Sequence, residues 1–301
     1  MANITPITCI DVGGTFIKAG NVVNGKVRHE IKIETGELGI LTRTLLQIIV
    51  ELGGEAVGIG MAGLVDADGT ISSPPNFPGI ESLPLKEILQ EELNIPVFVD
   101  NDANMAALGE HRYGAGRGVK NLIMLTLGTG VGGGIIINDK LYHGRGYAGE
   151  VGHITIDPNG PLCLCDNYGC LESYIGADRI TEKAEKYVKM GMKTTLKSYA
   201  GKITPKIIKD GAYKGDPVAM DIVVEMSRLL GIAISNYCAI LDPERVIIGG
   251  GLSKMGDILL SGVKREVGRR LYSRKDIDIV FSELGDRAGI LGCYEMVIHS
   301  I

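Results

Sequence analysis

The sequence predicts an α/β protein of two domains with a duplicated, strand-rich core. The chain has 301 residues, of which 45% are hydrophobic, and this length suits about two domains with separate cores. Short β-branched runs alternate along it with segments of helical periodicity, the pattern of α/β folds. A strand, a glycine-rich turn and a second strand occur near the N-terminus and again from residue 121, which indicates an internal duplication at the level of architecture.

The first half of the chain opens with a predicted β-meander. Residues 7–35 contain three β-branched runs separated by Gly-rich or Asn-Gly turns, which reverse the chain between antiparallel strands. Apolar periodicity and polar caps then predict alternating helices and strands. In order they are a helix over 37–52, a strand over 56–63, a helix over 81–93, a strand over 95–100 and a helix over 101–114.

The second half repeats the strand pattern over 121–142 and then has an irregular stretch over 150–172. No low-complexity linker separates the halves, so the domain boundary is expected near the helix that spans 104–113. The remaining predicted elements are helices over 176–190 and 216–241, a strand over 245–251, a helix over 256–272, a strand over 277–281 and a helix over 287–299.

The composition argues against several classes of protein. A net charge of −5 and a pI near 5.6 disfavour nucleic acid as a partner, because binding phosphates demands a basic face. The N-terminal residues lack the regions of a signal peptide, and the apolar stretches are too short to cross a bilayer. A cytoplasmic protein without a membrane partner is expected. In that reducing compartment, six cysteines with a Cys-x-Cys cluster beside a histidine favour metal binding over disulfides.

The segment 150–172 gathers three thiols, one imidazole and two carboxylates. The expected ligands of a tetrahedral zinc ion are His153, Cys163, Cys165 and Cys170. Four protein ligands leave no position for a metal-bound water, so we predict a structural zinc and not a zinc hydrolase. The second ring nitrogen of His153 can hydrogen bond to a substrate, and Glu150 and Glu172 suit the vicinal hydroxyls of a sugar.

Three glycine clusters follow predicted strands, at 11–15, 127–134 and 248–253. Their glycines let the backbone bend tightly and present N–H groups to an anion, and Thr15 and Lys18 add a hydroxyl and a cation. A simple hairpin turn explains the first cluster equally well, but two such turns could clamp a polyphosphate. The third cluster could accommodate a flat base or a ribose. None matches the P-loop or a clean dinucleotide-binding fingerprint, which disfavours those two nucleotide folds.

The segment VDNDAN at 99–104 places two acids and two amides where a predicted strand ends and a helix begins. Polar groups at that position face the crevice in which α/β proteins bind ligands. Capping of the helix by Asn101 or Asp102 is the simpler interpretation. A carboxylate there can also accept the proton of an attacking hydroxyl while an amide orients the substrate, so both roles stay open.

Taken together, these motifs resemble those of the ROK family of repressors, uncharacterised open reading frames and sugar kinases, within the actin, hexokinase and Hsp70 ATPase superfamily. The resemblance covers nearly the whole chain and rests on the order and spacing of DVGGT, VDNDAN, LGTGVGGG, GEVGH, CLCDNYGCLE, LDPERVIIGGGLS and GDRAGILGC. The family's zinc signature has glycine after Cys-x-Cys, where this chain has Asp166. That departure touches no ligand and bears on local backbone geometry.

The resemblance implies an actin-like ATPase fold of the ribonuclease H-like type, with two domains and an interdomain cleft. The smaller α/β domain would comprise residues 1–112 and 289–301, completed by the C-terminal helix. The larger α/β domain would comprise residues 113–288 and contain the zinc loop. A homodimer or higher homo-oligomer is also implied.

The resemblance further implies ATP-dependent phosphorylation of a hexose by in-line transfer, with Asp102 as the general base. The sugar would be held by Gly63, Asn76, Asn101, Asp102, Glu150, His153 and Glu172. The phosphates and Mg²⁺ would meet Asp11, Gly13, Gly14 and Thr15, with Lys18 as an added cation, and on the other side Thr129 and Gly130. Gly250 and Gly251 would flank the adenosine, and Zn²⁺ would be held by His153, Cys163, Cys165 and Cys170.

Several alternatives stay open. The resemblance favours glucose as the substrate, which a glucokinase of glycolysis converts to glucose 6-phosphate. The same residues also suit N-acetylmannosamine, N-acetylglucosamine, fructose, mannose or allose. Polyphosphate or ADP could replace ATP as donor. The alternative of another class is a non-catalytic sugar-sensing regulator. Because only ten residues precede Asp11, we expect no room for the DNA-binding helix-turn-helix of the family's repressors.

Overall fold

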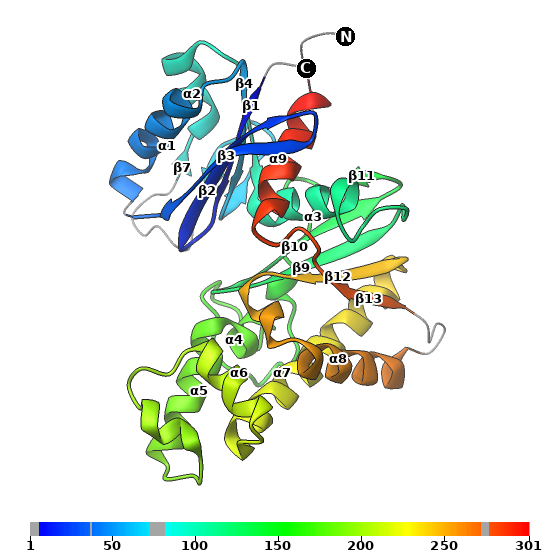
Figure 1. Ribbon diagram of the computed structural model, residues 1–301. Coiled ribbons are helices and arrows are strands. Elements are labelled where there is room, and N and C mark those ends of the chain that lie inside the picture. The colour runs from blue at the N-terminus through cyan, green and yellow to red at the C-terminus, as the bar shows by residue number, and fades with distance from the viewer. Residues whose placement is uncertain (1–5, 37, 73–81, 272–276, 301) are drawn as a thin grey trace. The chain divides into compact units, whose positions relative to one another are not determined.

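The computed structural model describes residues 6–36, 38–72, 82–271 and 277–300 (Figure 1). It confirms the predicted α/β class and the duplicated strand-rich core. Two five-stranded sheets have the strand orders β3-β2-β1-β4-β8 and β11-β10-β9-β12-β13. In each sheet, three consecutive strands come first in reverse order and two later strands follow. The internal duplication indicated by the sequence therefore corresponds to a repeated sheet. A third, three-stranded sheet has the order β5-β6-β7.

The strands are β1 (Ile7–Val12), β2 (Phe16–Val23), β3 (Lys26–Glu34), β4 (Ala56–Met61), β5 (Leu64–Val65), β6 (Ile71–Ser72), β7 (Ser82–Leu83), β8 (Val97–Asn101), β9 (Leu122–Leu127), β10 (Val131–Ile137), β11 (Lys140–Leu141), β12 (Arg245–Gly249) and β13 (Asp278–Phe281). The α-helices are α1 (Leu38–Leu52), α2 (Leu85–Leu93), α3 (Asp102–Tyr113), α4 (Glu172–Ile175), α5 (Ala177–Lys189), α6 (Pro205–Tyr213), α7 (Pro217–Leu241), α8 (Asp257–Arg270) and α9 (Ala288–Ile298). Short 3₁₀ turns are η1 (Val151–His153), η2 (Thr195–Tyr199), η3 (Gly251–Met255) and η4 (Gly285–Arg287).

The chain forms two compact units. Unit 1 comprises Met1–Met124, Gly133–Gly149 and Ser282–Ile301, and unit 2 comprises Leu125–Gly132 and Glu150–Phe281. The domain limits expected from the resemblance, 1–112 with 289–301 and 113–288, stay a prediction, as does the cleft.

The sheet of unit 1 is covered on both faces by helices (Figure 1). Strand β1 pairs antiparallel with β2 and parallel with β4, which pairs parallel with β8. Side chains alternate between the faces of a strand. Ile10 and Val12 therefore join the core beneath α1 and α2, whereas Ile7 and Cys9 join the core beneath α3 and α9.

Helices α3 and α9 cross at glycines. A Cβ atom at Gly109 would lie 2.0 Å from the carbonyl oxygen of Ala288, and one at Gly292 would lie 1.8 Å from that of Met105. Both distances are far below van der Waals contact, so only glycine permits this approach. The crossing holds α3, which carries the VDNDAN motif at its start, firmly on the C-terminal helix.

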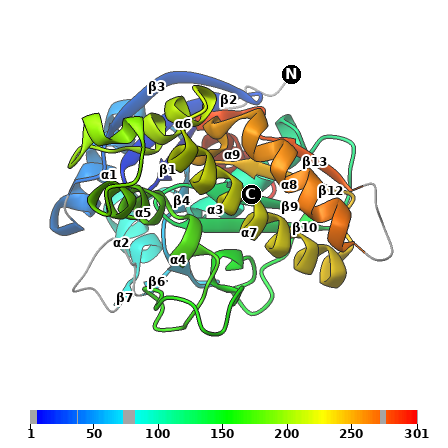
Figure 2. The ribbon, with the colours of Figure 1, turned by 90° about the horizontal axis from the view of Figure 1, so that it is seen from below.

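Helices α7 and α8 of unit 2 lie side by side (Figure 2). Their close packing again requires glycine, because a Cβ atom at Gly231 would lie 2.6 Å from Glu266 Cβ, and one at Gly262 would lie 2.6 Å from Ser227 Cβ. Asp216 caps the start of α7 by accepting the N–H groups of the second and third residues of the helix, and Pro217 occupies its first position.

Strands β5 and β6 were not predicted, and the structure also differs from the predicted helices at three places. Helix α2 begins at Leu85 and not at 81, because Pro84 occupies the N-cap and the two residues before it form β7. The helix predicted over 176–190 is α5, and a separate short helix, α4, precedes it. Helix α6 was not predicted, although Thr204 followed by Pro205 is a typical helix start, and Thr204 does cap it.

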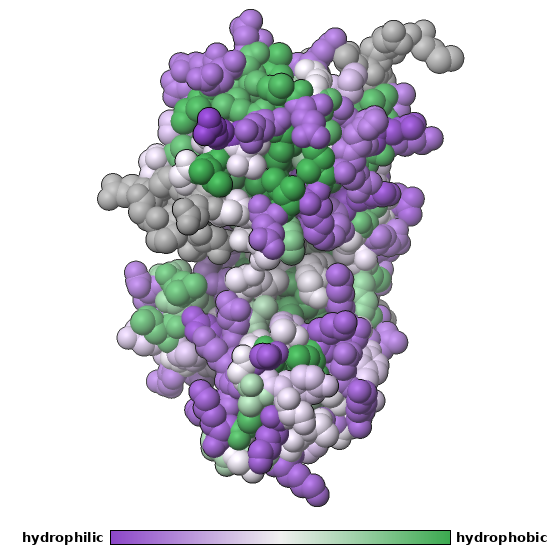
Figure 3. Space-filling model, turned by 60° about the vertical axis from the view of Figure 1, so that its left-hand side comes forward, coloured by the Kyte–Doolittle hydropathy of each residue, from purple (hydrophilic) through white to green (hydrophobic). Residues whose placement is uncertain are grey.

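The described surface has apolar side chains among polar ones. Leu164, Val50 and Ile240 are 75%, 73% and 80% exposed and belong to different elements. On the face drawn in Figure 3, hydrophilic residues interrupt the hydrophobic ones. The homo-oligomer implied by the resemblance therefore stays a prediction. Within the described ranges, no helix combines the length and apolarity that a membrane span requires.

Candidate functional site

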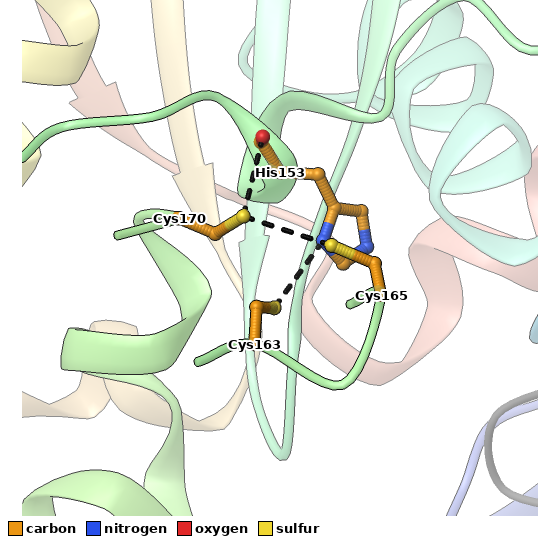
Figure 4. A group of neighbouring side chains, drawn as sticks. All are labelled: His153, Cys163, Cys165 and Cys170. Carbon is orange, nitrogen blue, oxygen red and sulfur yellow. Dashed lines mark hydrogen bonds between the residues drawn. The ribbon is translucent and has the colours of Figure 1, made fainter. Parts of the chain in front are cut away.

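His153 and three cysteines of unit 2 bring their side chains together (Figure 4). His153 ends η1, and Cys163, Cys165 and Cys170 come from the loop that follows, so we call residues 153–170 the metal loop. The four possible ligand atoms all lie within 4.8 Å of one another. Cys163 Sγ lies 3.7 Å from His153 Nδ1, and the sulfurs of Cys165 and Cys170 are 3.6 Å apart.

These separations fit a tetrahedral zinc ion. Sulfur ligands about 2.3 Å from zinc lie about 3.8 Å from one another at the corners of a tetrahedron. The sulfur–sulfur distance of 3.6 Å between Cys165 and Cys170 and the sulfur–nitrogen distance of 3.7 Å between Cys163 and His153 are both close to that value. His153 turns Nδ1 toward the cysteines and leaves Nε2 3.8 Å from Glu150 Oε2, so its two nitrogens face different partners. The four predicted ligands form a closed donor set of the kind that holds structural zinc.

The metal loop folds back on itself through backbone contacts. Leu162 and Tyr168 form a bridge, and the Cys163 N–H donates to the Asn167 oxygen at 2.8 Å. The Asp166 N–H donates to the Cys163 oxygen at 3.1 Å, which closes a turn around Cys165. Asp166 has φ = 62°, in the left-handed region that glycine prefers and aspartate tolerates. The residue that departs from the family signature thus adopts a backbone conformation that glycine accepts without strain.

We expect Asp166→Ala to destabilise the zinc-loaded protein by about 1 kcal/mol, because alanine pays the full cost of the left-handed conformation. Asp166→Gly removes that cost and should lie within about 0.5 kcal/mol of the parent or above it. Thermal unfolding of the three proteins measures the difference. Asp178→Ala, at an exposed position in α5, is the matched control. Equal stability of the Asp166→Gly and Asp166→Ala variants would contradict the left-handed turn.

Two carboxylates contact the metal cluster. Glu150, just before η1, lies 3.8 Å from His153 Nε2. Burial raises the pKa of Glu150; His153 opposes this shift, and Glu172 adds to it. Glu172 is the first residue of α4, and its Oε1 lies 3.9 Å from Cys163 Sγ, while its Oε2 accepts the Val131 N–H at 2.8 Å. Unit 2 therefore places both predicted acids beside the metal cluster.

The second glycine cluster forms a tight turn between β9 and β10, in which the Gly128 N–H donates to the Gly130 oxygen at 2.9 Å. The third cluster approaches this turn, because a Cβ atom at Gly250 would lie 2.4 Å from the Leu127 oxygen. Gly250 also has φ = 81°, so both its close contact and its backbone conformation require glycine. A Cβ atom at Gly251, the exposed first residue of η3, would meet nothing within 4 Å. Unit 2 thus brings the two clusters together.

In unit 1, Asn101 and Asp102 stand where β8 ends and α3 begins. Asn101 is the N-cap: its Oδ1 accepts the N–H groups of Ala103 and Asn104 at 2.9 and 3.1 Å. Its Nδ2 donates to the Gly63 oxygen at 3.0 Å, which ties two predicted sugar contacts to each other. Asp102 is the first helical residue, and its Oδ1 accepts the Ala103 N–H at 2.8 Å. Asn76, a further predicted sugar contact, lies outside the described residues.

The first glycine cluster is also a tight turn. The Gly13 N–H donates to the Phe16 oxygen at 3.0 Å, and the Thr35 hydroxyl donates to the Gly13 oxygen at 2.7 Å. Gly14 and Thr15 are exposed at the tip of this turn. The backbone here has the open, fixed form that anion binding requires.

Behind the turn, Asp11 and Lys18 form an ion pair. Lys18 Nζ lies 3.2 Å from Asp11 Oδ2 and 3.4 Å from Asp286 Oδ1. Burial raises the pKa of Asp11, and Lys18 opposes that shift. Gly289 of α9 packs on this carboxylate, since a Cβ atom there would lie 2.6 Å from Asp11 Cγ. Asp286 and Gly289 belong to the motif GDRAG, but the sequence alone did not indicate that Asp286 contacts Lys18 or that Gly289 packs on Asp11.

A second pair that the sequence did not reveal lies beside Asn101. Asp100 is buried, and its Oδ1 accepts the Asn101 N–H at 2.6 Å and an Asn104 N–H at 3.0 Å. Its Oδ2 lies 2.7 Å from His143 Nε2, in the segment between β11 and η1. The hydrogen bond with Asp100 raises the pKa of His143, although burial opposes the shift. Asp100 thereby fixes the backbone from which Asn101 and Asp102 project.

The pair makes stability depend on pH. Because the folded-state pKa of His143 is raised, its contribution is complete below the unfolded value of about 6.5 and is lost as pH rises through the folded value. We expect His143→Gln to lower the free energy of unfolding at pH 6 by about 1 kcal/mol or less, and by a smaller amount at pH 9. Denaturant titrations at both values measure this. His29→Asn, an exposed control, should change the free energy of unfolding by the same amount at pH 6 and pH 9. A pH-independent effect of His143→Gln would contradict the ion pair.

Comparisons with known proteins agree with this fold and these motifs. The sequence profile of the ROK family matches residues 7–300. A glucokinase from Halalkalibacterium halodurans is 38% identical, with 94% of this chain and 92% of that one covered. A xylose repressor from Caldicellulosiruptor bescii is also 38% identical, over 81% of this chain but only 63% of the repressor.

Among solved structures, a ROK family glucokinase from Streptomyces griseus in complex with glucose and AMPPNP superposes with a TM-score of 0.87. Its sequence is 34% identical, over 97% of this chain and 98% of that one. The fold is thus the two-sheet, actin-like fold of the ROK sugar kinases. The chain belongs to the ROK family.

Proposed function

We propose that this protein transfers the γ-phosphoryl group of ATP to a hexose, with glucose as the preferred acceptor. The observation that carries the proposal is the arrangement at the start of α3. Asn101 is the N-cap of the helix, and the carboxylate of Asp102, the first helical residue, lies at the carboxyl end of a parallel strand. That is where α/β proteins bind ligands. The similarity to a glucokinase solved with glucose and AMPPNP supports the same assignment.

In the proposed reaction, Asp102 accepts the proton of the sugar hydroxyl as its oxygen attacks the γ-phosphorus of ATP. The new O–P bond forms while the bond to the β-phosphate oxygen breaks, and ADP leaves. Asn101 and the Gly63 backbone would orient the sugar beside this base. Their hydrogen bond to each other supports a common role.

The acids of unit 2 supply the other proposed sugar contacts. Glu150 and Glu172 would accept sugar hydroxyls, and His153 Nε2, the nitrogen that faces away from the cysteines, would complete the set. Zinc, held by His153, Cys163, Cys165 and Cys170, would fix the imidazole and take no part in the chemistry, since the donor set is closed.

The glycine turns would hold the nucleotide. Gly13, Gly14 and Thr15 would present N–H groups and a hydroxyl to the phosphates, as would Thr129 and Gly130. Asp11 and Lys18 would orient Mg²⁺ and the phosphates. Gly250 and Gly251 would flank the adenosine, and the close approach of Gly250 to Leu127 brings them beside the second glycine cluster.

The second candidate is a sugar-sensing regulator without catalysis, which is favoured by the similarity to xylose repressors. The two functions differ in one measurable product. We would supply ATP, Mg²⁺ and one sugar at a time from glucose, fructose, mannose, allose, N-acetylglucosamine and N-acetylmannosamine, and measure ADP release. The proposal requires sugar-dependent ADP, with the highest kcat/KM for glucose. Sugar binding without ADP release from any of the six would instead support the regulator.

A further inference from the structure

The turn between β9 and β10, residues 128–131, packs against the segment that follows the metal loop. We call it the donor turn, because the proposed function assigns it to the nucleotide phosphates. Glu172 Oε2 accepts the Val131 N–H at 2.8 Å, and the Ala177 N–H donates to the Gly128 oxygen at 2.9 Å. Both ends of the donor turn are therefore hydrogen bonded to the segment 172–177.

Three glycines make this contact close. A Cβ atom at Gly130 would lie 2.4 Å from Glu172 Oε2, and one at Gly176 would lie 2.8 Å from the Thr129 oxygen. One at Gly152 of η1 would lie 2.1 Å from the Val131 oxygen. The backbone contacts at Gly176 and Gly152 leave no room for a side chain, whereas a side chain at Gly130 would displace the carboxylate of Glu172. The donor turn thus packs closely against η1 and the end of α4.

The same segment is tied to the metal cluster. Cys170, a predicted zinc ligand, precedes Glu172 by two residues, and its Sγ lies 3.4 Å from the His153 oxygen. The Leu171 N–H donates to the Ile154 oxygen at 3.0 Å. Glu172 Oε1 lies 3.9 Å from Cys163 Sγ. One carboxylate therefore touches the cluster with one oxygen and the donor turn with the other.

We propose that Glu172 is a positioning residue for the nucleotide, and that through it the metal cluster orders the donor turn. A carboxylate near phosphates repels them, so charge does not explain a direct role in nucleotide binding. Its hydrogen bond explains more, because an acceptor oxygen held at this distance from the Val131 N–H fixes the turn before the phosphates arrive. This inference rests on the proposed function only in assigning the donor turn to the nucleotide, and it adds to the sugar contact proposed for Glu172.

The test measures nucleotide binding without sugar, so that the sugar role of Glu172 does not enter. Calorimetry with AMPPNP and Mg²⁺ on the zinc-loaded full chain should give a Kd about tenfold weaker for Glu172→Ala. Glu172→Gln keeps an oxygen that can accept the Val131 N–H and should stay within about threefold of the parent. Glu172→Asp keeps the charge but withdraws it by one methylene, and should behave like the alanine variant. Glu182→Gln, an exposed acid in α5, is the control.

Amide hydrogen exchange provides a readout that needs neither sugar nor nucleotide. Val131 should exchange faster in Glu172→Ala and Glu172→Asp, and also in the parent after chelation of its zinc, but not in Glu172→Gln. If the alanine variant fails to fold, the comparison of the aspartate and glutamine variants decides. Parent-like AMPPNP affinity and Val131 exchange in Glu172→Asp would overturn the inference and leave the proposed function intact. A parent protein that binds no AMPPNP would instead overturn the proposed function.

Discussion

Asp102→Asn should lower kcat for hexose phosphorylation by about 10²- to 10⁴-fold, the range that a positioned general base contributes. The amide has nearly the shape of the carboxylate but cannot accept the proton of the sugar hydroxyl. Asn101 remains as the cap of α3, so the helix start should be unchanged. A coupled assay of ADP release gives kcat, and calorimetry with the sugar shows whether binding is kept.

Asp257→Asn is a matched control for this variant. Asp257 is likewise the first residue of a helix, α8, so its substitution removes a carboxylate from an equivalent position. We expect near-parental kcat. Near-parental turnover in Asp102→Asn as well would reject Asp102 as the base and leave it a helix-terminal acid.

Loss of the zinc site should have the largest effect on stability. We expect Cys163→Ser to bind less than the single zinc ion per chain expected of the parent and to lower Tm by about 10 °C or more, because structural zinc contributes directly to folding. Elemental analysis and calorimetric scans measure the two effects. Cys238→Ser, a cysteine of α7 outside the cluster, should keep the metal.

The binding of zinc should also be sensitive to acid. Burial and the neighbouring thiols raise the pKa of Cys170 to about 12, so without a metal this group is a neutral thiol near pH 7. Zinc binding must then displace protons, and its affinity should fall as pH falls. Parental Tm in a Cys163→Ser protein shown to lack zinc would contradict a folding role for the metal.

The cluster of His153 and three cysteines could be predicted because its members lie in one short segment with characteristic residue types. The repeated sheet could be predicted for a similar reason, since its strands and glycine turns recur in the same order. Both signals are local, and local patterns survive in a sequence without knowledge of the fold. Asp166 is instructive: the sequence has aspartate where the family signature has glycine, and the structure places this aspartate in the left-handed region.

The supporting contacts could not be predicted, because they join distant parts of the chain. His143 and Asp100 are 43 residues apart. The buried carboxylate of Glu110 accepts the Leu284 N–H at 2.8 Å across 174 residues. No spacing rule connects such pairs, and a single histidine or glutamate has no pattern of its own. The roles proposed for Asp102, Glu150 and the glycine turns stay predictions until they are measured.

The crossing of α3 and α9 bears on how the protein matures on the ribosome. Unit 1 draws on three separated stretches of chain, and the core beneath α9 combines Ile7 and Cys9 with Ile290, Cys293 and Val297. The first strand emerges long before the helix that shields one of its faces. During synthesis that apolar face stays open while all of unit 2 is made, so native closure waits for α9 and is of high contact order. Any need for a chaperone would therefore arise when β1 is made and end when α9 packs on it.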